Sequence, residues 1–184
     1  MFVLSAVAAL LGGAVIFFYN KLVSGRQMTR NGWADIDVQL KRRADVIPQI
    51  VTAVKAYAAH ERSLFEEIAA RRAGALEAGD DPTGRADAER AFAAPVAKLI
   101  AVAEDYPDLK ASESFLALQK ELADTEDKIE MARRFYNGAA RDFNIAVESV
   151  PSNFIASAFG FKPAAFFEIG DGDRAAPSLA GASS

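Results

Sequence analysis

Residues 115–146, FLALQKELADTEDKIEMARRFYNGAARDFNIA, contain the pattern that decides the fold. Apolar, small or hydroxyl side chains recur at alternating steps of three and four, at Phe115, Leu118, Leu122, Thr125, Ile129, Ala132, Tyr136, Ala139, Phe143 and Ala146. This period is typical of a long helix whose buried stripe packs against neighbours at about 20°. The stretch therefore predicts a helical bundle.

Helical periodicity also runs through the residues before this stretch. A helix is expected from Asp45 and Pro48, as its cap and first turn, to the turn at residues 79–84; a kink at Pro48 within one longer helix fits equally well. Its seam is Ile47, Val51, Val54, Ala58, Glu61, Phe65 and Ile68. A third helix is expected over residues 88–106, with Pro95 as a kink or a late start and Pro107 at its end. In no segment do apolar and polar residues alternate as they do in a β-strand, so we predict an all-α protein. Its residues 21–150 are expected to form an antiparallel up-down bundle.

Residues 1–20 differ from the rest of the chain because they carry no charged side chain. The apolar run from Phe2 to Tyr19 spans roughly 27 Å as a helix, close to the hydrocarbon thickness of a bilayer. We interpret it as a transmembrane anchor that continues into the bundle. A cleaved signal peptide lacks support because no basic residues precede the run; a buried core helix is the other alternative.

The charges that follow the anchor give an expected orientation. Residues 21–43 contain six basic and two acidic residues, a net charge of +4, whereas residues 44–184 carry −8. Basic residues favour the cytoplasmic side, and Lys21, Arg26 and Arg30 lie nearest the membrane. We therefore expect an inner-membrane protein with an outside N-terminus and a cytoplasmic bundle. The same basic residues could instead contact anionic lipids, or, for residues 41–43, lie on a solvated helix face.

A stripe of small side chains runs along the anchor at Ser5, Ala9 and Gly13. Such a stripe lets two membrane helices approach closely, so it predicts a homo-oligomer.

The residues after the bundle are rich in phenylalanine. Residues 151–169 contain Phe154, Phe159, Phe161, Phe166 and Phe167. These rings are expected to cap the bundle, enter a partner groove or lie in the membrane interface. Residues 170–184 have the composition of a disordered tail.

Composition excludes several chemistries. The chain has no Cys and one His, so Cys-ligated metals, disulfides and two-histidine sites are excluded. A pI near 5.1 disfavours nucleic acid as a partner, and no phosphate loop or serine elbow is present. We predict no enzymatic activity and no cofactor. The acidic and basic residues at 35–45 are explained by solvated pairs one helical turn apart, such as Asp37 with Lys41.

Charged and amide side chains on or beside the helix seams are expected to pair between helices and fix their register. These residues are Glu61, Glu104, Glu126, Arg133, Asn137 and Asn144. His60 could pair with a carboxylate of a facing helix. Metal binding by Glu61, Glu104 and Glu126 is the competing hypothesis.

Motifs spread along the chain resemble the LemA family of bacterial membrane proteins. They are YNxLV (19–23), WAxIDVQLKRRxDxIP (33–48), VKxYxxHE (54–61), ExYPDLK (104–110), LQxELxxTE (118–126), ARxxYN (132–137), FN (143–144), PSNxIA (151–156) and FFE (166–168). Pro95 departs from the pattern, which has an aliphatic residue there. The resemblance implies a membrane anchor with an antiparallel helical bundle and no established enzymatic activity. Some relatives are associated with membrane-bound metalloproteases or with organelle-like internal membranes.

These observations lead to a primary hypothesis and two alternatives. The first is a single-pass membrane scaffold, without catalysis, that self-assembles and organises the bilayer or other membrane proteins. The second is a regulatory partner of a membrane enzyme such as a metalloprotease. The third is a metal-dependent enzyme.

Overall fold

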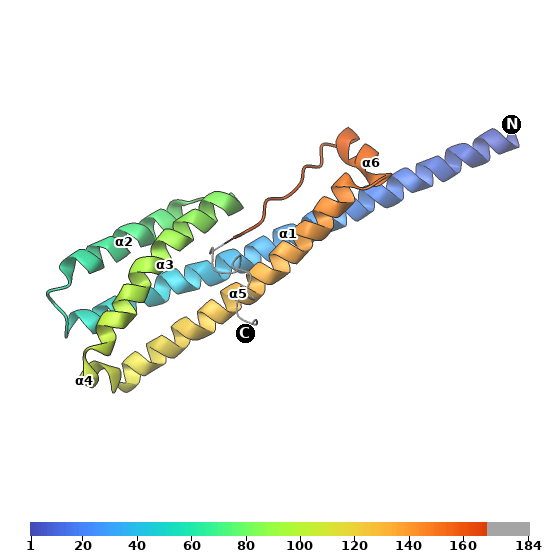
Figure 1. Ribbon diagram of the computed structural model, residues 1–184. Coiled ribbons are helices and arrows are strands. Elements are labelled where there is room, and N and C mark those ends of the chain that lie inside the picture. Colours follow the sequence, from blue (N-terminus) through green and yellow to red (C-terminus); the bar gives the residue numbers. More distant parts are fainter. Residues whose placement is uncertain (169–184) are drawn as a thin grey trace, which may run out of the picture.

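The computed structural model describes residues 1–168, except the side chain of Ala8, and all secondary-structure elements in this range are helices (Figure 1). Its elements are α1 (Phe2–Lys55), α2 (Arg62–Glu77), α3 (Pro82–Glu104), α4 (Pro107–Lys110), α5 (Glu113–Glu148) and α6 (Ser152–Ala158). The predicted disordered tail, residues 170–184, lies outside the described residues. The all-α prediction, with an anchor helix leading into packed helices, is confirmed.

Helix α1 is a single element of 54 residues that passes through Pro48. A proline inside a helix has no N–H for the carbonyl four residues earlier, here Ala44 O. Arg72 of α2 replaces the missing donor, because its Nε donates to Ala44 O at 2.5 Å. The helix therefore continues past Pro48, which resolves the alternative left open by the sequence.

The helix expected from Pro48 to the turn at 79–84 is interrupted, and this part of the prediction is wrong. The chain leaves α1 after Lys55 and starts α2 at Arg62. Val54 O accepts bonds from the N–H groups of Tyr57 and Ala58, and Ala58 is fully buried in the turn. The sequence of this turn, AYAAHE, contains neither Gly nor Pro, so it carries no local signal of a break.

Helix α3 begins at Pro82, six residues before the predicted start at residue 88. Pro82 occupies its first turn, and the Asp81 carboxylate accepts a hydrogen bond from Gly84 N at 2.8 Å, which satisfies one free N–H of the helix start. Pro95 is buried and lies inside the helix, so the alternative of a late helix start at this proline is wrong.

The two long helices, α1 and α5, lie antiparallel and form the spine of the molecule (Figure 1). The α2–α3 hairpin packs beside the spine at the end far from the N-terminus, around a core that includes Ile50, Phe92 and Phe115. Towards the N-terminal end, the segment after α6 covers the spine instead, with Phe167 and Phe161 at the centre of two smaller clusters. The apolar first part of α1 projects beyond both.

Close approach of the two spine helices depends on a glycine. A Cβ at Gly32 would lie 3.0 Å from Tyr136 Cα and 3.1 Å from Phe135 Cδ1. The absence of a side chain at this position lets the backbones of α1 and α5 meet near the middle of the spine.

Candidate functional site

The first functional region is the apolar start of α1. Among the described residues, α1 is the helix long and apolar enough to cross a membrane, with a mean hydropathy of 2.3 over 18 residues, none of them buried. This exposure removes the buried-core-helix alternative. The Ser5 hydroxyl donates to Phe2 O at 2.9 Å, and nothing lies within 4 Å of a Cβ placed at Gly13. The stripe of Ser5, Ala9 and Gly13 is therefore open to a second helix.

The second region is a buried ion-pair network where α1, α3 and α5 meet. Arg43 of α1 has 4% of its side chain exposed and pairs with Glu89 of α3, whose exposed fraction is 3%. Glu89 also accepts from Arg85 Nε at 3.0 Å. Arg85 in turn lies 3.5 Å from Asp37, which binds Lys41 at 2.6 Å. Together with Glu126, the network contains three basic and three acidic groups.

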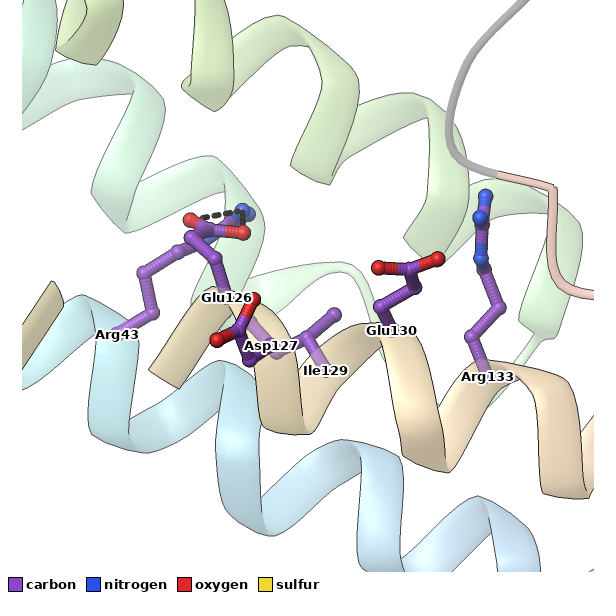
Figure 2. A pocket seen from close by; sticks show the side chains of 6 residues that line it. All are labelled: Arg43, Glu126, Asp127, Ile129, Glu130 and Arg133. Atoms are coloured by element: carbon purple, nitrogen blue, oxygen red, sulfur yellow. Dashed lines mark hydrogen bonds and ion pairs between the residues drawn. The ribbon is translucent and has the colours of Figure 1, made fainter. Parts of the chain in front are cut away.

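Glu126 of α5 completes the network at the surface. Arg43 Nη1 donates to Glu126 Oε1 at 3.1 Å, and Figure 2 shows the two side chains directed at each other from facing helices. The guanidinium of Arg43 also lies over the Phe92 ring, 5.6 Å from its centroid. Arg43 is thus held by two carboxylates and an aromatic face, which is how a buried charge avoids a large desolvation cost.

Two hollows flank the Arg43–Glu126 pair. One, of about 280 Å³, also contains Asp127, Glu130 and Arg133 of α5 (Figure 2). The other, of about 360 Å³, is lined mainly by apolar side chains of α3. The charged groups that line the two hollows are carboxylates and guanidinium groups.

The third region is a clamp that holds the C-terminal segment on α5. Asn144 donates to Ala164 O at 2.9 Å and accepts from Ala164 N at 2.7 Å. Asn137, two turns earlier, makes the same pair of bonds to Phe167, at 3.0 and 2.9 Å. Each amide side chain therefore binds both polar groups of one backbone residue, as a neighbouring strand would.

Tyr136 adds a fifth hydrogen bond to this clamp, from a third side chain. Its hydroxyl donates to Ala165 O at 2.7 Å. Burial raises the pKa of the Tyr136 phenol above its ordinary value of 10.0, and the Asp81 carboxylate raises it further. The phenol is thus kept neutral and able to donate.

The Phe-rich segment divides into two groups. Phe161 and Phe167 are buried against the spine, whereas Phe154, Phe159 and Phe166 are exposed. The Phe167 ring packs edge-on against Trp33, and the Phe161 ring lies against Tyr19 and Phe143. Two of the five rings cap the bundle, and the other three do not.

The basic residues near the membrane also differ in their surroundings. Lys21 and Arg30 are exposed. Arg26 is half-buried, with its guanidinium 4.8 Å from the centroid of the Phe161 ring. It therefore helps to hold the C-terminal segment, as a cation over an aromatic face.

The expected interhelical network does not form as one unit. Glu126 and Arg133 line the hollow beside Arg43, and Asn137 and Asn144 bind the C-terminal segment. Glu61 lies at the start of α2 beside the exposed His60, at 3.5 Å, and Glu104 is exposed at the end of α3. Among residues 1–168, no cluster of three potential metal ligands is present.

Two members of the buried network, Arg85 and Glu89, were not anticipated, and the interpretation of Arg43 as solvated is wrong. A signal for Glu89 was present, because it continues the α3 seam of Phe92, Val96, Leu99 and Ala103 in steps of three and four. Arg43 likewise falls between the buried Leu40 and Ile47 on α1. A charge at a seam position predicts a buried partner.

These features define a class: a membrane-anchored antiparallel helical bundle with a buried ion-pair network. The chain belongs to the LemA family, whose model matches residues 32–180.

Named relatives support the same assignment. Magnetosome protein MamQ 2 and magnetosome protein MamQ 1 of Paramagnetospirillum magneticum are each 27% identical to this chain over 191 residues, covering 90% of it and 70% of the relative. Protein LemA of Metamycoplasma hominis is 25% identical over 155 residues, covering 84% of this chain and 71% of the relative. None of these names denotes an enzyme. The family membership and the helix α1 describe a membrane-anchored protein.

Proposed function

We propose that this chain is a membrane scaffold that self-associates through its anchor and organises membrane proteins or the bilayer around it. The observation that carries the proposal is the continuity of α1, which is both the anchor and the spine of the bundle. With no loop between the two parts, the bundle has a fixed direction relative to the membrane helix. A rigid spacer of this kind suits a structural role.

Self-association is assigned to the small-residue stripe of the anchor. Ser5, Ala9 and Gly13 lie on one face, and Ala14 lies about 140° away from Ala9 at 3.6 residues per turn. Ala9→Leu therefore fills the proposed contact, whereas Ala14→Leu makes the same chemical change on another face.

Mass photometry of the detergent-solubilised protein tests this proposal. The wild type and the Ala14→Leu variant are expected to form oligomers at matched protein and detergent concentrations, and the Ala9→Leu variant to shift towards monomer. A strict monomer at all concentrations would overturn self-assembly, and equal oligomers in the two variants would overturn the role of the stripe.

A second candidate function is regulation of a membrane enzyme such as a metalloprotease. It is favoured by Met131 and Phe135, which are exposed one turn apart on one face of α5, and by the exposed Met28 of α1. Phe135 lies about 200° from Asn137 on α5, so this face is turned away from the clamped C-terminal segment. Exposed apolar side chains gathered on one face favour protein contact.

Co-purification from native membranes separates the two candidates. A membrane protease recovered with the wild type and lost with Phe135→Ser would support the regulatory function. Recovery of the chain alone would exclude it and leave the scaffold.

We also propose the inner membrane as the location, with the bundle in the cytoplasm. This rests on the basic residues after the anchor, two of which, Lys21 and Arg30, are exposed.

A further inference from the structure

An uncharged stretch lies next to the membrane anchor in the folded chain. Residues 149–161, SVPSNFIASAFGF, carry no charge between Glu148 and Lys162 and include the whole of α6. Apolar side chains project from this stretch: Phe154 is 67% exposed, Phe159 is 56% exposed and Val150 is 74% exposed. Three large apolar groups in contact with water are costly unless something covers them.

The position of this stretch is fixed by the chain reversal that follows α6. Phe161 N donates to Ala156 O at 2.9 Å, and Gly160, with φ of 69°, adopts the left-handed conformation that the reversal requires. The reversal inserts Phe161 into the spine and places Phe159 against α1. The Phe159 and Tyr19 rings meet edge-on, with their centroids 4.9 Å apart.

Tyr19 is the last residue of the apolar run that forms the anchor. Tyr19 is therefore expected to lie at the membrane interface, where α1 leaves the hydrocarbon layer. Because Phe159 contacts Tyr19, α6 lies at that same level, beside α1 at the base of the bundle (Figure 1).

We propose that α6 and its turn form a second membrane contact, in which Phe154 and Phe159 enter the headgroup–acyl boundary of the bilayer that α1 spans. This inference rests on the anchor of the proposed function. Tyr rings are enriched in this layer, and interfacial helices bury Phe side chains about 5–10 Å into it. Lys21, two residues after Tyr19, and Lys162, directly after the stretch, are both exposed and suit anionic headgroups.

A lipid surface fits these observations better than a second protein copy. Any group held against Tyr19 meets lipid as soon as α1 is inserted, whatever the protein concentration. The absence of charge over residues 149–161 removes the main cost of entering that layer. Two contacts at one level would also set the tilt of α1 and hence the direction of the bundle.

Depth-dependent quenching by doxyl-labelled lipids tests the proposal, because the chain has no native Cys. Ala158 is exposed, about 40° and 100° from Phe154 and Phe159 around α6, so Ala158→Cys places an environment-sensitive fluorophore between the two rings. The full chain is reconstituted in phosphatidylcholine–phosphatidylglycerol vesicles. The label at 158 is expected to shift to the blue and to lose emission when doxyl lipids are present.

Two further labelled positions serve as controls. Leu116→Cys, an exposed apolar position near the start of α5, is expected to show no quenching, and Val15→Cys, inside the anchor, strong quenching. If doxyl lipids quench the label at 15 but leave the labels at 158 and 116 equally unquenched, the contact of α6 with the membrane is wrong while the anchor stands. A blue shift at 158 without lipid quenching would indicate a protein partner and also overturn the membrane contact of α6. Loss of quenching at 15 would overturn the anchor, and this inference with it.

Side-chain variants connect the effect to the two rings. Phe154→Gln with Phe159→Gln is expected to abolish quenching at 158, whereas Leu116→Gln with Met131→Gln, which also removes two exposed apolar groups, should leave it unchanged. Unaltered Trp33 emission shows that the spine is intact in both. Quenching that persists without the two rings would contradict their role.

Discussion

Arg43 connects three helices through one guanidinium group. Its partners Glu89 and Glu126 come from α3 and α5, and its own seam neighbours on α1, Leu40 and Ile47, are buried apolar residues. A sliding movement of either neighbouring helix would separate this charge from its carboxylates in a region with little water. The cost of that separation makes the network a means of fixing register.

Replacing Glu89 is therefore expected to be among the most damaging changes in the bundle. Glu89→Ala leaves Arg43 and Arg85 buried without their shared carboxylate, and loss of one partner of such a group typically costs about 3–5 kcal/mol. Glu121→Ala is the matched control, because Glu121 binds Arg42 at 3.1 Å in an exposed pair, where about 0–1 kcal/mol is expected. Chemical unfolding of the detergent-solubilised chains, followed by circular dichroism, measures both. Equal losses would contradict the assigned role of the network.

At the level of helices, the sequence predicts those helices in which apolar residues recur every three or four positions without a break. The seam of α5 and the passage of α1 out of the anchor follow from spacing alone. The break at residues 56–61 does not, because it contains no Gly or Pro and depends on burying Ala58 against the α2–α3 hairpin. The continuation through Pro48 depends likewise on Arg72, a residue of another helix.

The site residues also divide into those that the sequence predicts and those that it does not. Asn137 and Asn144 could be selected because they lie seven residues apart on one face. Their partners could not, since backbone atoms of Ala164 and Phe167 have no signature in the sequence. The pairing of Arg43 with Glu89 was within reach, because both are charges at seam positions, but the choice of partner depends on the register of α3 against α1.

The C-terminal segment is expected to be released at high pH through Tyr136. The folded state raises the pKa of this phenol above 10.0, so the stability it provides is complete below pH 10.0 and is lost as the pH rises through the folded value. An ionised phenolate cannot donate to Ala165 O. Trp33, the single Trp of the chain, contacts both Tyr136 and Phe167, so its emission reports the release.

The measurement is a fluorescence titration from pH 8 to above pH 10.0, the ordinary pKa of the phenol. The wild-type emission is expected to shift to the red above pH 10.0, with Tyr57→Phe, an exposed control, behaving in the same way. Tyr136→Phe is expected to lose about 1 kcal/mol at neutral pH, from the missing hydrogen bond, and to show a flatter profile. An identical red shift in this variant would assign the transition to another group.

For the whole molecule, orientation follows from how charge is distributed along the chain. Lys21, Arg26 and Arg30 lie within about 15 residues of the end of the apolar run, the distance over which basic residues act on topology. Arg26 is held by Phe161 in the folded bundle, but insertion of the anchor depends on charge rather than on that contact. The remainder of the chain is acidic, at −8 over residues 44–184, and acidic residues contribute little to orientation.

Ala59→Cys places a single thiol in the exposed turn between α1 and α2, at the end of the spine farthest from the anchor. We expect it to resist an impermeant maleimide in spheroplasts and to react after lysis. A Cys in a Gly-Ser linker inserted after Met1, ahead of the apolar run that starts at Phe2, is expected to react before lysis. The same two variants carrying Lys21→Glu and Arg30→Glu should give a mixed or inverted pattern, because the two exposed basic groups nearest the membrane are then acidic. Reaction of Ala59→Cys in intact spheroplasts, with the Cys inserted after Met1 protected, would place the bundle outside the cell and direct the search for its partners there.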